Sequence, residues 1–191
     1  GGKNTDFRTP ENWYPATVPS TNSHVVIAPV AGRTATVVLG VEPNSGVTLR
    51  NSLIAGNAYP AGYQAGVHVS AKVDAFSLIK NCTIAGNSAG HASAVGAGLY
   101  NANHRVLAVN SIVEGNAVTA ASRGMNVDIA KVTPALNTIC LELPEQNGCK
   151  QVEAGFKDAA KGDYSIDGTS PAVDAGSFTA SALDPSAADV A

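Results

Sequence analysis

A seven-residue pattern that recurs at an almost fixed interval limits the fold of this chain more than any other feature. The three copies are Asn51-Ser-Leu-Ile-Ala-Gly-Asn57, Asn81-Cys-Thr-Ile-Ala-Gly-Asn87 and Asn110-Ser-Ile-Val-Glu-Gly-Asn116. Their first residues lie 30 and 29 positions apart, and a shorter copy, Asn137-Thr-Ile-Cys140, begins 27 positions later. This period, without helical spacing of apolar residues, is typical of a solenoid in which each repeat forms one coil.

A second, weaker motif lies between the copies of the first. Its members share a glycine followed by an apolar residue: Ala65-Gly-Val-His-Val69, Ala97-Gly-Leu-Tyr-Asn101 and Arg123-Gly-Met-Asn-Val127. A third apolar run precedes the next asparagine, as in Phe76-Ser-Leu-Ile79 and Arg105-Val-Leu-Ala-Val109. Length varies only between these segments, so they are predicted strands joined by loops. We therefore predict an all-β fold, a right-handed parallel β-helix (single-stranded β-solenoid) of about five coils.

The repeated positions have separate physical roles. Four residues share one register and are expected to stack in the core, namely Ile54, Ile84, Val113 and Cys140. The glycines Gly56, Gly86 and Gly115 follow, where a turn requires positive φ.

Asparagine occupies both ends of the repeat. Stacked about 4.8 Å apart, the amides of Asn57, Asn87 and Asn116 can bond to one another along the solenoid, which predicts a ladder. The leading residues Asn51, Asn81 and Asn110 are a second candidate ladder. Ordinary turn asparagines are the alternative for the leading set, and the fixed spacing favours the ladder.

The ends of the chain differ from the repeats. Residues 1–45 contain short β-rich runs broken by proline and glycine, and we expect an N-terminal cap and the first strands there, because an open solenoid end exposes strand edges. Residues 46–176 are assigned to the coils and a closing motif. Residues 177–191 have no periodicity and are expected to form a loose C-terminal tail.

Composition excludes several function classes. Charged residues make up 14% of the chain, the net charge is −3, and no Lys/Arg cluster occurs, so nucleic acid is not an expected partner. No apolar run approaches the length of a membrane span. Paired-histidine and Cys-x-x-Cys spacings and a Gly-rich phosphate loop are absent from the sequence, so we expect neither a metal nor a cofactor.

The three cysteines leave two alternatives open. Cys140 and Cys149 flank a turn-rich spacer and could form a local disulfide, or both could remain unpaired thiols. Cys82 would then be left over as a small buried apolar residue.

One candidate binding ridge follows the glycine of the second motif. Strand alternation is expected to direct His68, Tyr100, Asn126 and Asp128 outward on one face. A solvated polar face is the plain interpretation of this ridge, and glycan binding is the functional one. Asp128 has no matching acid one coil away, so no catalytic residue is assigned.

The repeats also resemble a known group of proteins. Ile54-Ala-Gly-Asn57 and its copies resemble the Phe-x-x-Asn repeat of chlamydial-type polymorphic outer-membrane proteins, with an aliphatic residue in place of Phe. Gly96-Ala-Gly-Leu99 resembles that family's Gly-Gly-Ala-Ile repeat. Residues 162–176, which run from Gly-Asp-Tyr-Ser-Ile to Asp-Ala-Gly, are similar to the closing motif of bacterial surface β-helix proteins with a choice-of-anchor domain.

The resemblance implies a bacterial β-helix protein that is secreted or associated with the cell surface or outer membrane. We therefore expect a non-catalytic adhesive or structural module, whose partner would be a host or bacterial surface glycan or protein. The alternative is a carbohydrate-active β-helix enzyme, a polysaccharide lyase or a glycoside hydrolase, because this fold hosts both activities. Fold alone does not decide between these functions.

Overall fold

The computed structural model describes residues 26–27, 48–69, 77–101, 106–119, 128–130 and 135–177, and short parallel strands dominate it. The β2 sheet contains β2 (Thr48–Arg50), β6 (Ser77–Lys80), β10 (Val106–Val109) and β14 (Ala135–Leu136). The β3 sheet contains β1 (Val26–Ile27), β3 (Leu53–Ala55), β7 (Thr83–Ala85) and β11 (Ile112–Glu114). The β4 sheet contains β4 (Ala58–Tyr59), β8 (Ser88–Ala89) and β12 (Ala117–Val118). The β5 sheet contains β5 (Val67–Val69), β9 (Leu99–Asn101) and β13 (Ile129–Ala130).

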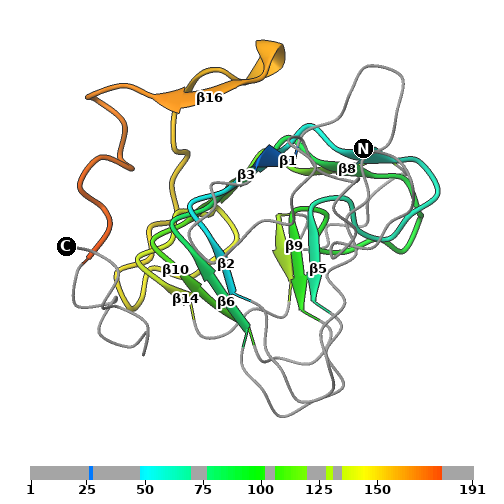
Figure 1. Cartoon of the computed structure of the whole chain (residues 1–191), viewed down its shortest axis with the longest axis horizontal. Coiled ribbons are helices and arrows are strands. Elements are labelled where there is room, and N and C mark those ends of the chain that lie inside the picture. Colours follow the sequence, from blue (N-terminus) through cyan, green and yellow to red (C-terminus); the bar gives the residue numbers. More distant parts are fainter. Residues whose placement is uncertain are drawn as a thin grey trace, which may run out of the picture.

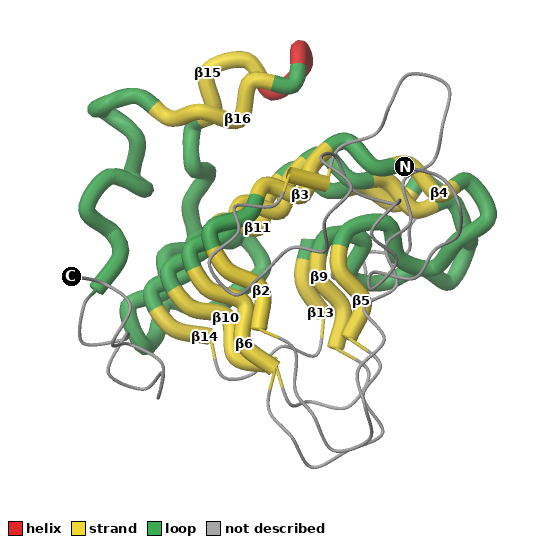
Figure 2. Tube along the Cα trace, viewed as in Figure 1, coloured by secondary structure: helices red, strands yellow, loops and turns green. Residues whose placement is uncertain are grey.

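Successive coils contribute one strand each to these sheets, and every pairing within them is parallel. Figures 1 and 2 show equivalent strands stacked together, with loops leading from one sheet to the next. Two isolated parallel bridges, Ile112 to Ile139 and Ile139 to Lys150, extend the β3 sheet. The arrangement is that of a parallel β-helix, which confirms the predicted fold class, and β6 and β10 confirm the third strand of each coil.

The core is a narrow column of aliphatic side chains. Ile54 pairs with Ile84, which pairs with Val113, and all three are almost completely buried. Because Ile139 pairs with Ile112, the fully buried Cys140 continues the column as predicted. Burying each such aliphatic side chain contributes about 1.5–3 kcal/mol.

Glycine and asparagine both supply the left-handed turns of the coil. Gly56, Gly86 and Gly115 have φ values of 65°, 62° and 67°. At Gly86 an added Cβ would also lie 2.1 Å from the Tyr164 hydroxyl, so a side chain there would have to displace the end of the Tyr164 ring as well. The leading asparagines have positive φ as well, a conformation that asparagine tolerates better than most residues.

The leading asparagines therefore combine the two roles that the sequence left open. Their φ values run from 45° to 53°, as expected of turn asparagines: Asn51, Asn81, Asn110 and Asn137. Asn81 Nδ2 also donates to Asn51 Oδ1 at 3.2 Å, which is one rung of an exposed ladder. Asn110 bonds to the backbone of Ser177 instead, donating from Nδ2 and accepting at Oδ1.

The trailing asparagines form the predicted ladder inside the solenoid. Asn57 Nδ2 donates to Asn87 Oδ1 at 2.8 Å, and Asn87 Nδ2 donates to Asn116 Oδ1 at 2.8 Å. The backbone N–H groups of Asn57 and Asn87 donate to the same two oxygens. These side chains are buried, so the bonds satisfy polar groups that water cannot reach.

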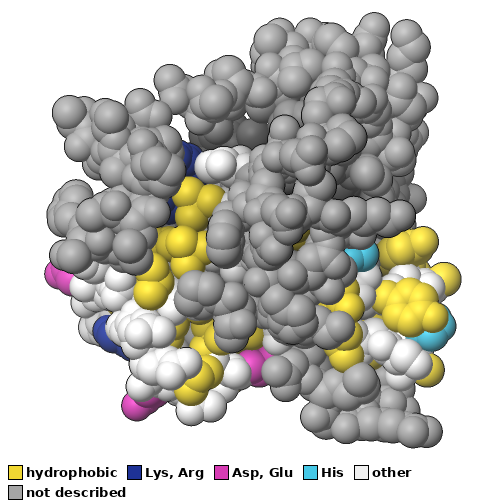
Figure 3. All heavy atoms as spheres, turned by 90° about the horizontal axis from the view of Figure 1, so that it is seen from below, with side chains coloured by type: hydrophobic (Ala, Val, Ile, Leu, Met, Phe, Trp, Pro, Cys, Tyr) yellow, Lys and Arg dark blue, Asp and Glu magenta, His cyan; other side chains and the backbone are white. Residues whose placement is uncertain are grey.

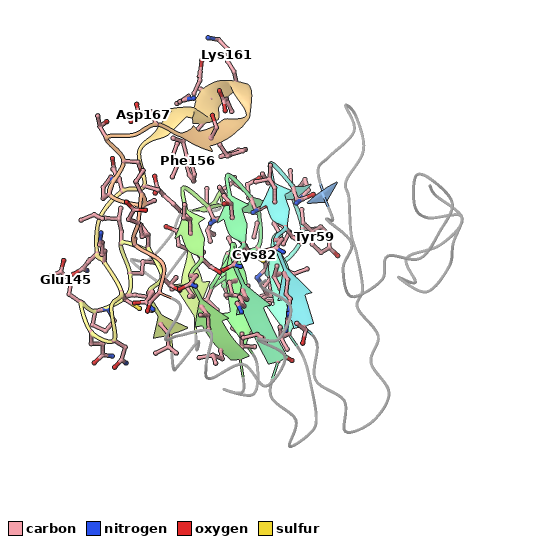
Figure 4. All side chains as sticks on the ribbon, turned by 60° about the vertical axis from the view of Figure 1, so that its left-hand side comes forward. Tyr59, Cys82, Glu145, Phe156, Lys161 and Asp167 are labelled. Carbon is pink, nitrogen blue, oxygen red and sulfur yellow. The ribbon has the colours of Figure 1, made fainter. Side chains whose placement is uncertain are left out.

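A second internal column was not predicted. It contains the residue after each leading asparagine: Ser52, Cys82, Ser111 and Thr138, all buried. Each hydroxyl or thiol donates to the carbonyl two residues earlier, at 2.7 Å for Ser52 and 3.2 Å for Cys82. Cys82 thus occupies a hydrogen-bonding position within the solenoid, and Figure 4 shows it among the stacked strands.

All three cysteines are free, buried thiols. For Cys140 and Cys149 the reason is geometric. Ile139 pairs with Lys150 in parallel, which offsets the two cysteines by two residues along neighbouring strands. In an ideal parallel pair, with about 3.3 Å per residue and about 4.8 Å between strands, such an offset separates two Cα atoms by about 8 Å, which is farther than a disulfide spans. Burial raises the pKa of Cys82 to about 11 and that of Cys140 to about 12.

Residues 151–177 leave the parallel stacks. β15 (Phe156–Asp158) pairs antiparallel with β16 (Asp163–Ile166) around the 3-10 helix η2 (Ala159–Lys161), and Figure 1 shows this hairpin projecting from the coils. The Phe156 and Tyr164 rings meet edge to face. Asp163 and Asp167 accept N–H bonds from Ser165 and Thr169 and so stabilise local turns.

The predicted ends of the chain lie largely outside the described residues. Within 1–45 only β1 is described, and it pairs with β3 as a strand of the coil. Within 177–191 only Ser177 is described.

Loss of one central ladder amide should destabilise the fold strongly. Replacing Asn87 with Ala removes two donor and two acceptor interactions of its side chain, and the buried backbone and Nδ2 N–H groups of Asn57 lose their acceptor. We expect the free energy of unfolding to fall by about 3 kcal/mol, measured by urea denaturation. Asn81→Gly is the matched control, because glycine accepts positive φ and the Asn81 bond is exposed. Equal losses in both variants would contradict a special role for the buried ladder.

The internal hydroxyl column makes a second prediction. Thr and Val have nearly the same shape, and Thr138 already occupies the position equivalent to Cys82 at one end of the column. Cys82→Thr should therefore be more stable than Cys82→Val by about 1 kcal/mol, because only Thr can donate to the Lys80 carbonyl. Urea midpoints of the two variants measure the difference, and a more stable Val variant would be inconsistent with the hydrogen-bonding role.

Candidate functional site

The first two members of the predicted ridge lie side by side. β5 and β9 pair so that His68 is opposite Tyr100. The centroids of the two rings are 5.2 Å apart, and the interplanar angle is 69°. His68 is exposed between the buried residues Val67 and Val69, as strand alternation predicts. Partial burial lowers the pKa of His68. The pair presents an imidazole and a phenol on the outside of the β5 sheet.

The predicted alignment of the third coil is wrong. Matching Gly124 to Gly98 placed Asn126 beside Tyr100 and Asp128 two positions farther along the outward face. In the structure Ile129 pairs with Leu99 and Ala130 pairs with Tyr100, so Asp128 takes the Gly98 position. Asn126 itself lies outside the described residues. Gly124 therefore does not hold the position of the motif glycine, which Asp128 occupies.

Asp128 is a ladder residue and not part of the exposed ridge. Its side chain is only 8% exposed. Its Oδ1 accepts the backbone N–H of Asn116 at 2.8 Å and the Nδ2–H of Asn116 at 2.7 Å. The carboxylate therefore supplies the acceptor that another asparagine would supply in a longer ladder.

The shortened fourth repeat explains why the ladder ends on Asp128. Since Ile112 pairs with Ile139, the residue equivalent to Asn116 is Leu143, which is buried in the hydrophobic core. Leucine offers no side-chain acceptor, so the ladder has to end at another element. One coil before Asp128 the equivalent residue is Gly98, where an added Cβ would lie 2.4 Å from Asn116 Nδ2.

Two further carboxylates lie near Asp128 and were missed by the sequence prediction. Glu142 Oε2 accepts the backbone N–H groups of Asp128 and Ile129 at 2.9 Å each. Glu114 Oε2 accepts the backbone N–H of Ala154. Burial, opposed by hydrogen bonds from Asn116, raises the pKa of Asp128. Burial also raises the pKa of Glu114, with repulsion from neighbouring acids adding to it.

An exposed aromatic corner was also missed. Tyr63 stacks on His91 with ring centroids 3.7 Å apart and an interplanar angle of 28°. Tyr59, at the end of β4, is 46% exposed, and Tyr63, in the loop that follows, is 49% exposed. These residues lie outside the repeated motifs, so sequence periodicity gave no signal for them.

The described part of the chain contains neither a candidate metal cluster nor a candidate membrane-spanning helix. Within it, His, Cys, Asp and Glu side chains form no group of three that could hold a metal ion. None of its helices has the length and apolar character to cross a bilayer.

The chain has no match among models of protein families, curated proteins or solved structures. The resemblance to bacterial surface β-helix proteins therefore remains a prediction from the sequence motifs.

The buried position of Asp128 predicts a pH dependence of stability. Its folded-state pKa lies above the ordinary value of 3.8, so its contribution to stability is fully present below that value and is lost as pH rises through the raised pKa. Asp128→Asn keeps an acceptor oxygen and does not titrate. The variant should gain stability relative to the wild type as pH rises above the ordinary carboxyl value of 3.8. Urea midpoints across this range measure the change, and a wild type that gains on the variant as pH rises would refute it.

Proposed function

We propose that this chain is a non-catalytic β-helix module of a secreted or cell-surface protein, with an adhesive or structural role. The observation that carries the proposal is the use of the clustered carboxylates. Asp128, Glu142 and Glu114 each accept backbone N–H bonds that hold one part of the solenoid against another. Their side chains therefore serve the fold.

The arrangement of these acids also bears on the enzymatic alternative. Hydrolysis of a glycosidic bond needs two carboxyl groups that face the same sugar, one of them available as an acid. Asp128 is buried, and its Oδ1 already accepts two bonds from Asn116. Turning it toward a substrate would leave Asn116 without its acceptor. This cost supports a structural role.

One observation favours the second candidate, a carbohydrate-active enzyme. The pKa values of Asp128 and Glu114 are both raised, and raised carboxyl pKa values are frequent in active sites. In each case burial is the main cause, as expected for acids inside a solenoid. We therefore rank this candidate second.

The proposed location and partner rest on separate support. The surface or extracellular assignment rests on the resemblance of residues 162–176 to a closing motif of surface β-helix proteins. An adhesive role is supported by the pair of the exposed His68 and the half-buried Tyr100 on the outside of the β5 sheet. Stacked coils suit such a role, because they repeat side chains at regular spacing along one face.

A depolymerisation assay separates the two candidates. The chain is incubated with neutral and acidic polysaccharides, and released reducing ends and unsaturated ends are measured. We expect no release above the protein-free blank. Glu142→Gln and Glu114→Gln are assayed in parallel, after circular dichroism shows that they are folded. Release by the wild type that either variant abolishes would establish the enzymatic candidate in place of this proposal.

A further inference from the structure

The corner between the β4 and β5 sheets carries two tyrosines that the solenoid does not bury. Tyr59 ends β4, Tyr63 lies in the loop that follows it, and His91 belongs to the equivalent loop of the next coil. In Figure 3 histidine and hydrophobic side chains lie together at one side of the molecule. Exposing two aromatic rings to water is unfavourable, which suggests that this corner contacts a ligand.

The aromatic rings of the corner are held in place by the two loops. His91 N–H donates to the Gly62 carbonyl, and Gly90 N–H donates to the Tyr59 carbonyl, both at 3.0 Å. The Tyr59 ring covers Gly62 so closely that an added Cβ would lie 1.8 Å from it. Because the rings are fixed before binding, little conformational entropy would be lost on contact with a ligand.

The hydrogen bonding of His91 defines what the corner offers to a ligand. Its Nδ1 accepts the backbone N–H of Ser93 at 3.1 Å. A nitrogen that accepts carries no proton, so the neutral ring carries its proton on Nε2. The corner thus combines ring faces, two phenol hydroxyls and one imidazole N–H donor.

The charge of the corner narrows the ligand class. Segments 58–69 and 88–101, which form both loops and the strands on either side of them, contain no Lys, Arg, Asp or Glu. Sulfated sugars and uronic acids are bound mainly by cationic side chains, which these segments lack. Neutral sugars have apolar C–H faces that pack on aromatic rings, and hydroxyl groups that pair with phenol and imidazole groups.

We infer that the Tyr59–Tyr63–His91 corner binds a neutral sugar chain. This inference rests on the proposed non-catalytic function and adds a ligand class and a site to it. The same two coils carry the His68–Tyr100 pair on the adjoining β5 sheet, so a chain of several sugar units has a second aromatic contact beyond the corner.

The test measures binding of defined oligosaccharides by isothermal titration calorimetry. The neutral probes are hexasaccharides of glucose in β-1,4 and β-1,3 linkage, of mannose and of N-acetylglucosamine, and the acidic probes are oligogalacturonate and heparin fragments. We expect at least one neutral probe to bind and the acidic probes to bind more weakly. Tyr63→Ala and Tyr59→Ala should each weaken binding by about tenfold or more.

Two matched variants keep the result specific. Tyr63→Phe retains the ring and should lose less affinity than Tyr63→Ala. Leu141→Ser removes an exposed apolar side chain outside the corner and should bind as the wild type does. Urea denaturation checks that each variant is folded.

Several results would overturn the inference. These are binding of acidic probes alone, binding of no probe, or neutral binding that survives both alanine substitutions. The depolymerisation assay tests the proposed function separately, because an enzyme would release new chain ends whether or not the corner residues bind the polysaccharide.

Discussion

The buried amide ladder is the interaction on which the rest of this structure depends. Asn57, Asn87 and Asn116 lie inside the solenoid, where an unbonded amide would cost about 1–3 kcal/mol. Their bonds form only when successive coils are in one register, so the ladder opposes a slip of any coil. The same register brings Tyr63 against His91 and His68 against Tyr100, and the ladder therefore also positions the exposed aromatic pairs.

The last donor of such a ladder needs an acceptor from another element, and this requirement explains the unusual third coil. Asn116 donates to Asp128, because the fourth repeat provides Leu143 where an asparagine would be needed. Glu142 then accepts the backbone N–H groups of Asp128 and Ile129, and so joins the turn that holds Glu142 to β13. Asp128 and Glu142 are thus part of how the solenoid ends, which is the basis for proposing a non-catalytic module.

The sequence predicted what is repeated and missed what occurs once. The core column, the turn glycines and the buried ladder recur at fixed spacing, and the structure confirms them. Asp128 occurs once, at the end of a connection of a different length, so alignment on Gly124 assigned it to the wrong face. The offset of Cys140 and Cys149 depends on the pairing of Ile139 with Lys150, which no spacing rule reveals. The stacking of Tyr63 on His91 likewise follows from two loops meeting in space.

Hydrogen exchange of the asparagine side-chain amides tests the central claim most directly. In two-dimensional NMR spectra the Nδ2 protons of Asn87 and Asn116 should exchange with solvent slowly, on the timescale of global unfolding, because both groups are buried and bonded. The Nδ2 protons of Asn81, whose bond is exposed, should exchange much faster. Equally fast exchange at all three residues would show that the ladder is not closed, and would contradict its role in fixing the register of the coils.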